Sequence, residues 1–159
     1  MIKCFTKNTH VAVVCQCNDP LDDFTRASYE LFGKDSVFRF ISQSQEAKLA
    51  RRGEETWKEC TRTSNTPFEL PTHSCLVIAT TSISCGTFQG DTILPTRSFP
   101  FVIVDEGQMH GNYETGLLVH LLTLGAILCY FGDRNQTYPH EPPAFHKPSI
   151  LGDLTRFTM

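Results

Sequence analysis

The pair Asp105-Glu106 has the clearest chemical potential in this sequence, because it directly follows the apolar run Phe101–Val104. A carboxylate at the end of a buried strand can hold Mg²⁺, directly or through water, beside the phosphates of a nucleotide. A second carboxylate next to it can accept a proton from an attacking water. The pair therefore has the chemistry that hydrolysis of a nucleoside triphosphate requires.

A second polar group follows the other apolar run, Ala126–Phe131. It consists of Gly132-Asp133 and, three residues later, Gln136. A neutral amide at such a place can sense a terminal phosphate without adding repulsive charge. Two such groups favour a nucleotide hydrolase, in which catalysis is mostly positioning and electrostatics. The alternative is that acids merely end strands at the point where strands meet water.

The two apolar runs must be brought together for this chemistry. They do not alternate polar with apolar residues, so they predict strands buried on both faces, as in a parallel sheet covered by helices. Between them, Tyr113–Leu124 is predicted to be a helix with leucines available for one face. Such crossovers are almost always right-handed, and both acidic ends then lie at the carboxyl edge of the sheet, where ligands bind in open α/β folds.

The rest of the chain predicts more elements of the same kind. Further buried strands are expected at Thr9–Cys15, Ser36–Ile41 and Cys75–Thr80. Helices are expected at Leu21–Phe32, which Pro20 opens and Gly33 stops, and at Gln43–Arg52. The remaining segments are expected to be a polar surface insertion (Glu54–Pro71), a loop (Gly86–Arg97), an irregular stretch (Glu141–Pro148) and a short last helix (Ser149–Phe157). This alternation predicts an α/β sheet in three layers, with the strand order left open.

Composition narrows the class of protein. A chain of 159 residues with 40% hydrophobic content supports one domain, and a net charge of −3 gives no global basic field, so nucleic-acid binding would need a local surface. Seven cysteines, an odd number without a Cys-x-x-Cys pair, predict a reducing compartment. No signal peptide and no apolar run of about 20 residues is found, so an intracellular protein without a membrane span is expected.

Segments along nearly the whole chain resemble the first motor domain of superfamily 1 helicases of the up-frameshift/Dna-two/Sen-one type, which translocate on RNA or DNA. Val102–Gln108 resembles motif II, the Walker B segment, and Tyr130–Gln136 followed by Pro139 resembles motif III. The other similar segments are Cys17–Phe24 (motif Ia), Val37–Arg39 (the Val-x-Arg strand), Val77–Thr81 (motif Ic) and Pro148–Leu154 (the end of the domain).

The resemblance implies a RecA-like parallel sheet of the P-loop NTPase type, with residues 1–159 as part of the first motor domain. It implies ATP and Mg²⁺ as cofactors. Asp105 would coordinate the Mg²⁺ ion, Glu106 would be the general base, and Gln136 would contact the γ-phosphate. Gly132 and Asp133 would shape the loop that carries Gln136 and complete the nucleotide site.

The resemblance also implies partners. Asn18, Thr80 and Thr81 would touch the backbone of single-stranded RNA or DNA, although a turn preference of Asn18 and the β-propensity of threonine explain these residues as well. The remainder of a helicase polypeptide would be the second partner. Work in the cytoplasm or nucleus follows by analogy with the family. Neither RNA nor DNA is favoured by the residues themselves.

The largest departure from the family is an absence. Motif I, the Gly-x-x-x-x-Gly-Lys-Ser/Thr loop, should precede the Thr9–Cys15 strand, and the residues there do not match it. That loop supplies the amide cradle and the lysine for the phosphates. We therefore expect a sheet incomplete at its N-terminus, exposed strand edges and apolar surface, marginal stability, and an isolated chain that is inactive as a helicase.

Several explanations remain open. The chain fits a fragment of a larger helicase, a truncated gene model or a degenerate paralogue that binds RNA or protein without catalysis. The Asp-Glu-x-Gln spacing at Asp105–Gln108 is closer to helicases of the UvrD/Rep type, which keeps that subfamily as an alternative. A third hypothesis is an unrelated nucleotide-binding α/β domain whose acids are coincidental.

Overall fold

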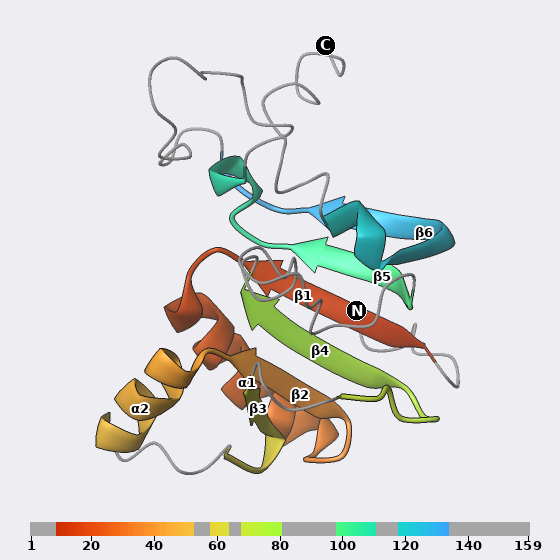
Figure 1. The fold of residues 1–159 in the computed structure, drawn as a ribbon. Helices are drawn as coiled ribbons and strands as arrows, with labels where there is room; N and C mark the ends of the chain where they lie inside the picture. Colours follow the sequence, from red (N-terminus) through yellow and green to blue (C-terminus); the bar gives the residue numbers. More distant parts are fainter. Residues whose placement is uncertain (1–8, 53–57, 64–67, 81–97, 111–117, 134–159) are drawn as a thin grey trace.

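A six-stranded sheet in which every pairing is parallel forms the centre of the protein. It is seen in a computed structural model that describes residues 9–52, 58–63, 68–80, 98–110 and 118–133 (Figure 1). The strands are β1 (His10–Cys15), β2 (Val37–Ile41), β3 (Thr61–Thr63), β4 (Cys75–Thr80), β5 (Phe99–Val104) and β6 (Leu122–Tyr130). They lie in the order β3-β2-β4-β1-β5-β6. The predicted α/β class with a parallel sheet is confirmed.

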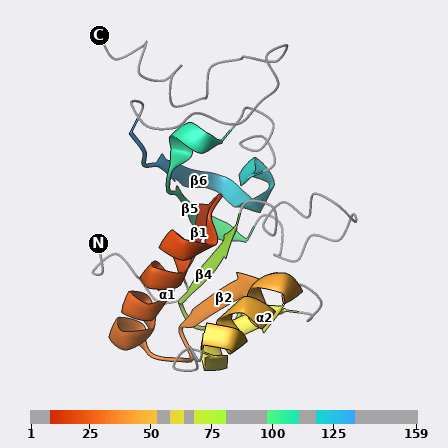
Figure 2. The same ribbon diagram turned by 90° about the vertical axis from the view of Figure 1, so that its left-hand side faces the viewer.

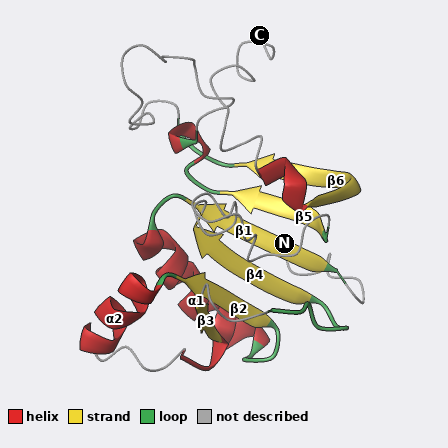
Figure 3. Ribbon diagram, in the orientation of Figure 1, coloured by secondary structure: helices red, strands yellow, loops and turns green. Residues whose placement is uncertain are grey.

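Two α-helices and three short 3₁₀ turns connect these strands in the described part of the chain (Figure 3). They are α1 (Asn18–Phe32), α2 (Gln43–Arg52), η2 (Lys58–Cys60), η3 (Gly107–Met109) and η4 (Val119–Leu121). The predicted bounds of α2 and β4 are confirmed to the residue. Helix α1 begins three residues earlier than predicted, and Gly33 ends it with a positive φ of 79°, as expected for a helix stop.

The two faces of the sheet bury different sets of side chains. Helix α1 lies along one face (Figure 2), where Leu21 and Phe32 pack with Val11 and Val13 of β1. The opposite face holds a cluster built from these buried side chains and others: Ala12, Val14, Phe40, Val77, Phe99, Val102, Leu118 and Leu121. In the described residues that face is covered by η4 and the segment 68–70, so no third layer of α-helix is described there.

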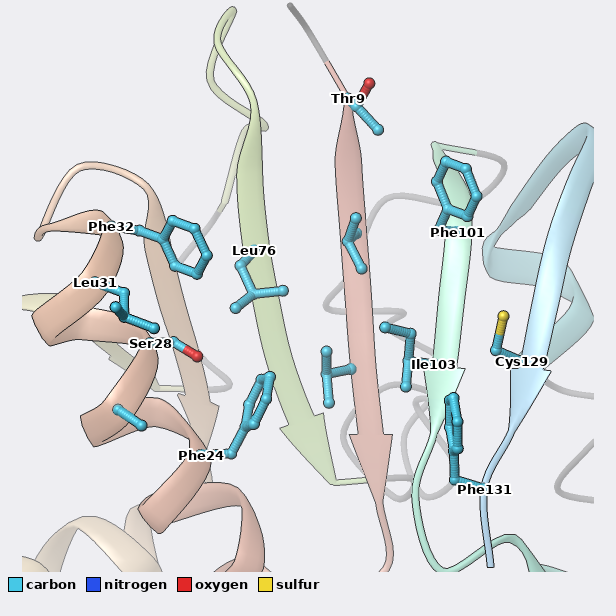
Figure 4. A pocket seen from close by; sticks show the side chains of 13 residues that line it. Thr9, Phe24, Ser28, Leu31, Phe32, Leu76, Phe101, Ile103, Cys129 and Phe131 are labelled. Atoms are coloured by element: carbon cyan, nitrogen blue, oxygen red, sulfur yellow. The ribbon is translucent and has the colours of Figure 1, made fainter. Parts of the chain in front are cut away.

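The connection between β5 and β6 differs from its prediction. A helix was predicted over Tyr113–Leu124, but 119–121 is a 3₁₀ turn and Leu122–Leu124 belongs to β6; residues 111–117 lie outside the described part. Strand β6 is the last strand of the sheet, and the exposed fractions of Leu124 and Ile127 are 102% and 52%. The prediction that the run Ala126–Phe131 is buried on both faces is therefore wrong: its Ile127 and Phe131 are 52% and 51% exposed, and no described element covers β6 on the face that carries α1, where the strand borders an apolar pocket of about 410 Å³ (Figure 4).

The prediction that Glu54–Pro71 is a polar surface insertion is also wrong in part. It contains η2 and β3, and β3 pairs in parallel with β2 at the edge of the sheet. Cys60, just before β3, is fully buried against Ile41 and Leu49. The predicted loop at Gly86–Arg97, the irregular stretch at Glu141–Pro148 and the helix at Ser149–Phe157 lie outside the described residues. Neither α1 nor α2 is long and apolar enough to cross a membrane.

Candidate functional site

The two acidic segments lie side by side at the carboxyl edge of the sheet, as predicted. Strands β5 and β6 pair in parallel, with Val104 opposite Tyr130, so Asp105 and Gly132 follow neighbouring strand ends. Asp105, Gly132 and Asp133 are exposed, and Glu106 is half-buried. Gln136 and Thr81, which were predicted to contact phosphate and nucleic acid, lie outside the described residues.

The loops after β5 and β6 pack tightly against each other. The N–H of Gly107 donates to the carbonyl oxygen of Phe131 at 2.7 Å, and the N–H of Phe131 donates to Val104 at 2.8 Å. A Cβ atom at Gly107 would come within 2.5 Å of the Tyr130 ring, and one at Gly132 would collide with the Gln108 side-chain oxygen. A Cβ atom at Gly107 therefore has no room beside the Tyr130 ring, and one at Gly132 would force the Gln108 side chain to move. The two loops form one unit.

Glu106 is held in a strained conformation. Its φ of 50° and ψ of 42° are left-handed, and it is the one non-glycine residue with positive φ in the described part of the chain. This conformation costs about 1–2 kcal/mol for a residue with a Cβ atom. Backbone strain of this kind is concentrated at functional sites. The observation therefore adds independent support for a role of Glu106 beyond packing.

The thiol of Cys15, at the end of β1, donates to Oε2 of Glu106 at 3.3 Å. Burial, together with the nearby carboxylates of Glu106 and Asp105, raises the pKa of Cys15 to about 12. The thiol therefore stays protonated near neutral pH and fixes one carboxylate oxygen of Glu106, which leaves the other oxygen to accept a proton. This contact was not predicted, because the sequence pattern around Cys15 indicated only an ordinary apolar residue of a buried strand.

Asp105 fits a single-carboxylate site for a hard cation. Its backbone N–H donates to Val14 of β1 at 2.9 Å, and its Oδ1 accepts the N–H of Glu106 at 2.9 Å. In the described ranges no group of three or more His, Cys, Asp or Glu side chains is arranged to hold a metal ion. A Mg²⁺ ion held by the Asp105 carboxylate alone would need phosphate and water oxygens as its other ligands, which is its usual mode of binding beside nucleotides.

A buried polar network that was not predicted fixes Asn18 at the start of α1. The side chain of Arg39, fully buried on β2, makes four hydrogen bonds. Two reach Oδ1 of Asp22 at 3.1 and 3.0 Å, one reaches Oδ1 of Asn18 at 2.9 Å, and one reaches the carbonyl oxygen of Phe40 at 2.7 Å. Gln45 of α2 donates to the other oxygen of Asp22 at 3.0 Å.

This network determines which way the Asn18 amide points. Arginine only donates hydrogen bonds, so the oxygen of the Asn18 amide must face Arg39. The amide nitrogen then has no hydrogen-bond partner among the described residues, and Asn18 is half-buried. Thr80, by contrast, is 4% exposed at the end of β4, so its side chain does not present a free surface. Of the two predicted nucleic-acid contacts that the structure describes, Asn18 is therefore the one whose side chain keeps a hydrogen-bond donor without a described partner.

Burial shifts the pKa values of the two charged side chains of the network in opposite directions. It raises the pKa of Asp22, against the opposing effect of Arg39, and it lowers the pKa of Arg39. The sequence carried one signal for this pair, since an arginine stands inside the apolar strand Val37–Ile41. A charge at such a position needs a buried partner.

Comparison with models of protein families, with curated proteins and with solved structures gave no match for this chain.

Proposed function

We propose that this chain is part of the first motor domain of an ATP-dependent helicase, in which ATP hydrolysis drives movement along single-stranded RNA or DNA. One observation carries the proposal. Asp105, Glu106 and the Gly132-Asp133 loop gather at one carboxyl edge, on two hydrogen-bonded parallel strands. This is where α/β folds bind nucleotides. A RecA-like sheet of the P-loop type is the fold that would accompany this function.

Each residue at the edge has a role in this proposal. ATP with Mg²⁺ supplies the phosphoanhydride bond that water breaks. Asp105 would hold the cation through its exposed carboxylate, and Glu106 would take a proton from the water through the oxygen that Cys15 does not occupy. By the resemblance, Gln136 would contact the γ-phosphate. Such a site works by positioning and electrostatics, and the strained Glu106 backbone fits that requirement.

Asn18 would contact the nucleic acid. Because Arg39 holds the amide oxygen, Asn18 presents an N–H donor, which suits a phosphate or sugar oxygen. Contacts of this kind carry no sequence information, as a motor that moves along a strand requires. Residues 1–159 contain no match to motif I, so weak ATP binding is expected for these residues alone.

A second candidate is a non-catalytic module that binds RNA or protein. The network around Arg39 favours it, because the orientation of Asn18 depends on Asp22 and Gln45 and on nothing at the nucleotide edge. In that case the strand contact would persist in a chain that does not hydrolyse ATP.

The test uses the complete reading frame that contains this chain, purified and assayed for ATP hydrolysis stimulated by single-stranded RNA or DNA. The proposal expects stimulated hydrolysis that falls about 100-fold or more in Glu106→Gln, the range for loss of a general base. Glu30→Gln, at an exposed position of α1, is the matched control and should change the rate less than twofold. Absence of stimulated hydrolysis, or an unchanged rate in Glu106→Gln, refutes the motor proposal; strand binding that persists without hydrolysis supports the second candidate.

A further inference from the structure

Two side chains join the end of β1 to the acidic loop that follows β5. The Gln16 side chain donates from Nε2 to the carbonyl oxygen of Met109 at 2.7 Å, and the Cys15 thiol donates to Oε2 of Glu106 at 3.3 Å. Met109 is the last residue of the turn η3 (Gly107–Met109), and Gln16 is half-buried beside it. The short segment that leads from β1 into α1 is therefore fastened to the loop that carries Glu106.

This segment also carries Asn18, the first residue of α1. Arg39 determines which way the Asn18 amide points, through the 2.9 Å hydrogen bond to its oxygen. Gln16, two residues earlier, determines instead where the backbone before Asn18 lies relative to Met109. A displacement of Met109 must therefore either move the segment before Asn18 or break the hydrogen bond to Gln16.

The acidic loop carries two unfavourable features within three residues. Glu106 has a left-handed backbone, and the side-chain oxygen Oε1 of Gln108, a residue only 2% exposed, accepts no hydrogen bond from any described residue. A left-handed residue with a Cβ atom and a buried acceptor without a donor each cost free energy. A rearrangement that relieves them regains this free energy, so the loop is suited to a change between two arrangements.

A change in the Glu106 backbone would reach Met109 directly. The carbonyl oxygen of Glu106 accepts the N–H of Met109 at 2.8 Å, and the N–H of Gly107 donates to the carbonyl oxygen of Phe131 at 2.7 Å. Rotation of Glu106 out of the left-handed region turns the peptide bond between Glu106 and Gly107, so both hydrogen bonds are lost. Met109 is then no longer held from within the turn, and Gln16 loses its fixed acceptor.

We propose that Gln16 is a positioning residue that couples the backbone conformation of Glu106 to the nucleic-acid contact at Asn18. The left-handed conformation of Glu106 keeps Met109 where Gln16 reaches it, and departure from that conformation releases Gln16 and weakens binding of the strand. The inference rests on the proposed function for the identity of the partner, single-stranded RNA or DNA, but not on ATP hydrolysis. In the motor, this link is a route by which the nucleotide edge changes the affinity for the strand.

The test compares Glu106→Gly with Glu106→Val in the complete reading frame that contains this chain. Glycine adopts the left-handed conformation without strain, a β-branched residue is an outlier there, and both variants lack the carboxylate. Binding of fluorescein-labelled oligouridylate and oligothymidylate, as RNA and DNA probes, is measured by fluorescence anisotropy without nucleotide. The dissociation constant of Glu106→Val should exceed that of Glu106→Gly at least fivefold, about 1 kcal/mol, for one probe or both.

The same pair of variants is then measured with Gln16→Met added. Methionine has a similar length but donates no hydrogen bond, so the ratio of the two dissociation constants should fall to within twofold. The matched control is Gln43→Met, at an exposed position of α2, which should leave the ratio at fivefold or more. A loss of stability caused by valine persists when Gln16 is replaced, so a fall in the ratio measures the coupling and not the stability of the fold.

The outcomes separate this inference from the motor proposal. A ratio below twofold when Gln16 is present, or a ratio that Gln16→Met leaves unchanged, overturns the coupling even where stimulated ATP hydrolysis upholds the motor. A ratio that Gln16→Met abolishes supports the coupling even where the protein hydrolyses no ATP and the motor proposal fails. A wild-type protein that binds neither probe overturns both, because the contact at Asn18 is then absent.

Discussion

Replacing Arg39 by methionine should cause one of the largest losses of stability available to a single substitution in this protein. Methionine fills much of the space of the arginine stem but leaves Asp22, whose side chain is 8% exposed, as a buried charge without its partner. Removing one member of a buried ion pair costs about 3–5 kcal/mol. Asn18 and the carbonyl oxygen of Phe40 lose a donor in the same step. Since domains have a free energy of unfolding of about 5–15 kcal/mol, the variant should lose about a fifth or more of its stability.

The assay is urea unfolding of residues 1–159 followed by circular dichroism. The matched control is Arg26→Met, because Arg26 pairs with Asp23 at 3.3 Å with side chains 47% and 79% exposed. An exposed pair of this kind contributes about 0–0.5 kcal/mol, so this variant should be close to wild type. Both ion pairs join an arginine to an aspartate, and they differ in burial. The difference in the free energy of unfolding between the two variants therefore measures the effect of burial.

A third variant separates the buried charge from the loss of packing. Asp22→Leu/Arg39→Met removes both charges, and replacement of a buried ion pair by apolar residues is often neutral or stabilising. The double variant should therefore recover most of what Arg39→Met loses. A cost below about 1 kcal/mol for Arg39→Met, or no recovery in the double variant, refutes the argument that an unpaired charge dominates the loss.

The remaining predictions concern the loops, the thiols and the whole chain. Gly132→Ala should destabilise by about 1–3 kcal/mol, seen in urea unfolding, because its Cβ atom would collide with Gln108. Glu106→Gly should be about 1 kcal/mol more stable than Glu106→Ala in the same assay, because only glycine adopts a φ of 50° without strain. Burial raises the pKa values of Cys15 and Cys75 from 9.0 to about 12, so stability is kept below pH 9 and falls as the pH rises toward 12, by at most about 1.4 kcal/mol per pH unit for each thiol. The isolated chain should melt below about 55 °C in a thermal scan, because apolar surface stays open to water.

Controls for these predictions come from the same contacts. Gln108→Ala should rescue much of the loss in Gly132→Ala, since it removes the atom that collides with the new Cβ. In Cys75→Ala the urea midpoint should fall less steeply between pH 9 and pH 11, because one of the two buried thiols no longer loses its proton on unfolding. An unchanged slope contradicts the argument that the raised thiol pKa values cause the loss of stability. A sharp transition of the monomer above 55 °C contradicts the expected marginal stability.

The buried strands and the common edge could be predicted because each rests on a local pattern. Strand β4 is a continuous apolar run that falls between polar segments, and α2 is a run of helix formers, so both were placed to the residue. The shared edge of Asp105 and Gly132 follows from the crossover rule alone once two parallel strands are assumed. None of this needs a contact between residues that are distant in sequence.

The elements that were missed depend on distant partners. Strand β3 is three half-buried polar residues, Thr61–Thr63, and becomes a strand only because the edge of β2 is available. The leucines of Leu117–Leu124 fit a helix or a strand equally well. The tertiary structure decides for β6, with Leu122 opposite Phe99 and a shift in register before Ile127 pairs with Phe101. Arg39 could be placed in a strand from the sequence, but its partner Asp22 lies 17 residues away.

The stability of the fold alone does not favour the buried Asp22–Arg39 pair or the left-handed backbone of Glu106. Apolar residues at positions 22 and 39 would pack as well as the buried pair, and glycine at 106 would remove the strain of a left-handed carboxylate. The pair and the strained residue have in common that each fixes a polar group at the carboxyl edge of the sheet: the Asn18 amide through Arg39, and the Glu106 carboxylate through its own backbone. A variant that combines Asp22→Leu, Arg39→Met and Glu106→Gly should therefore fold at least as stably as the wild type and bind single-stranded RNA less tightly. Unchanged binding in such a variant would show that the network serves the fold and nothing more.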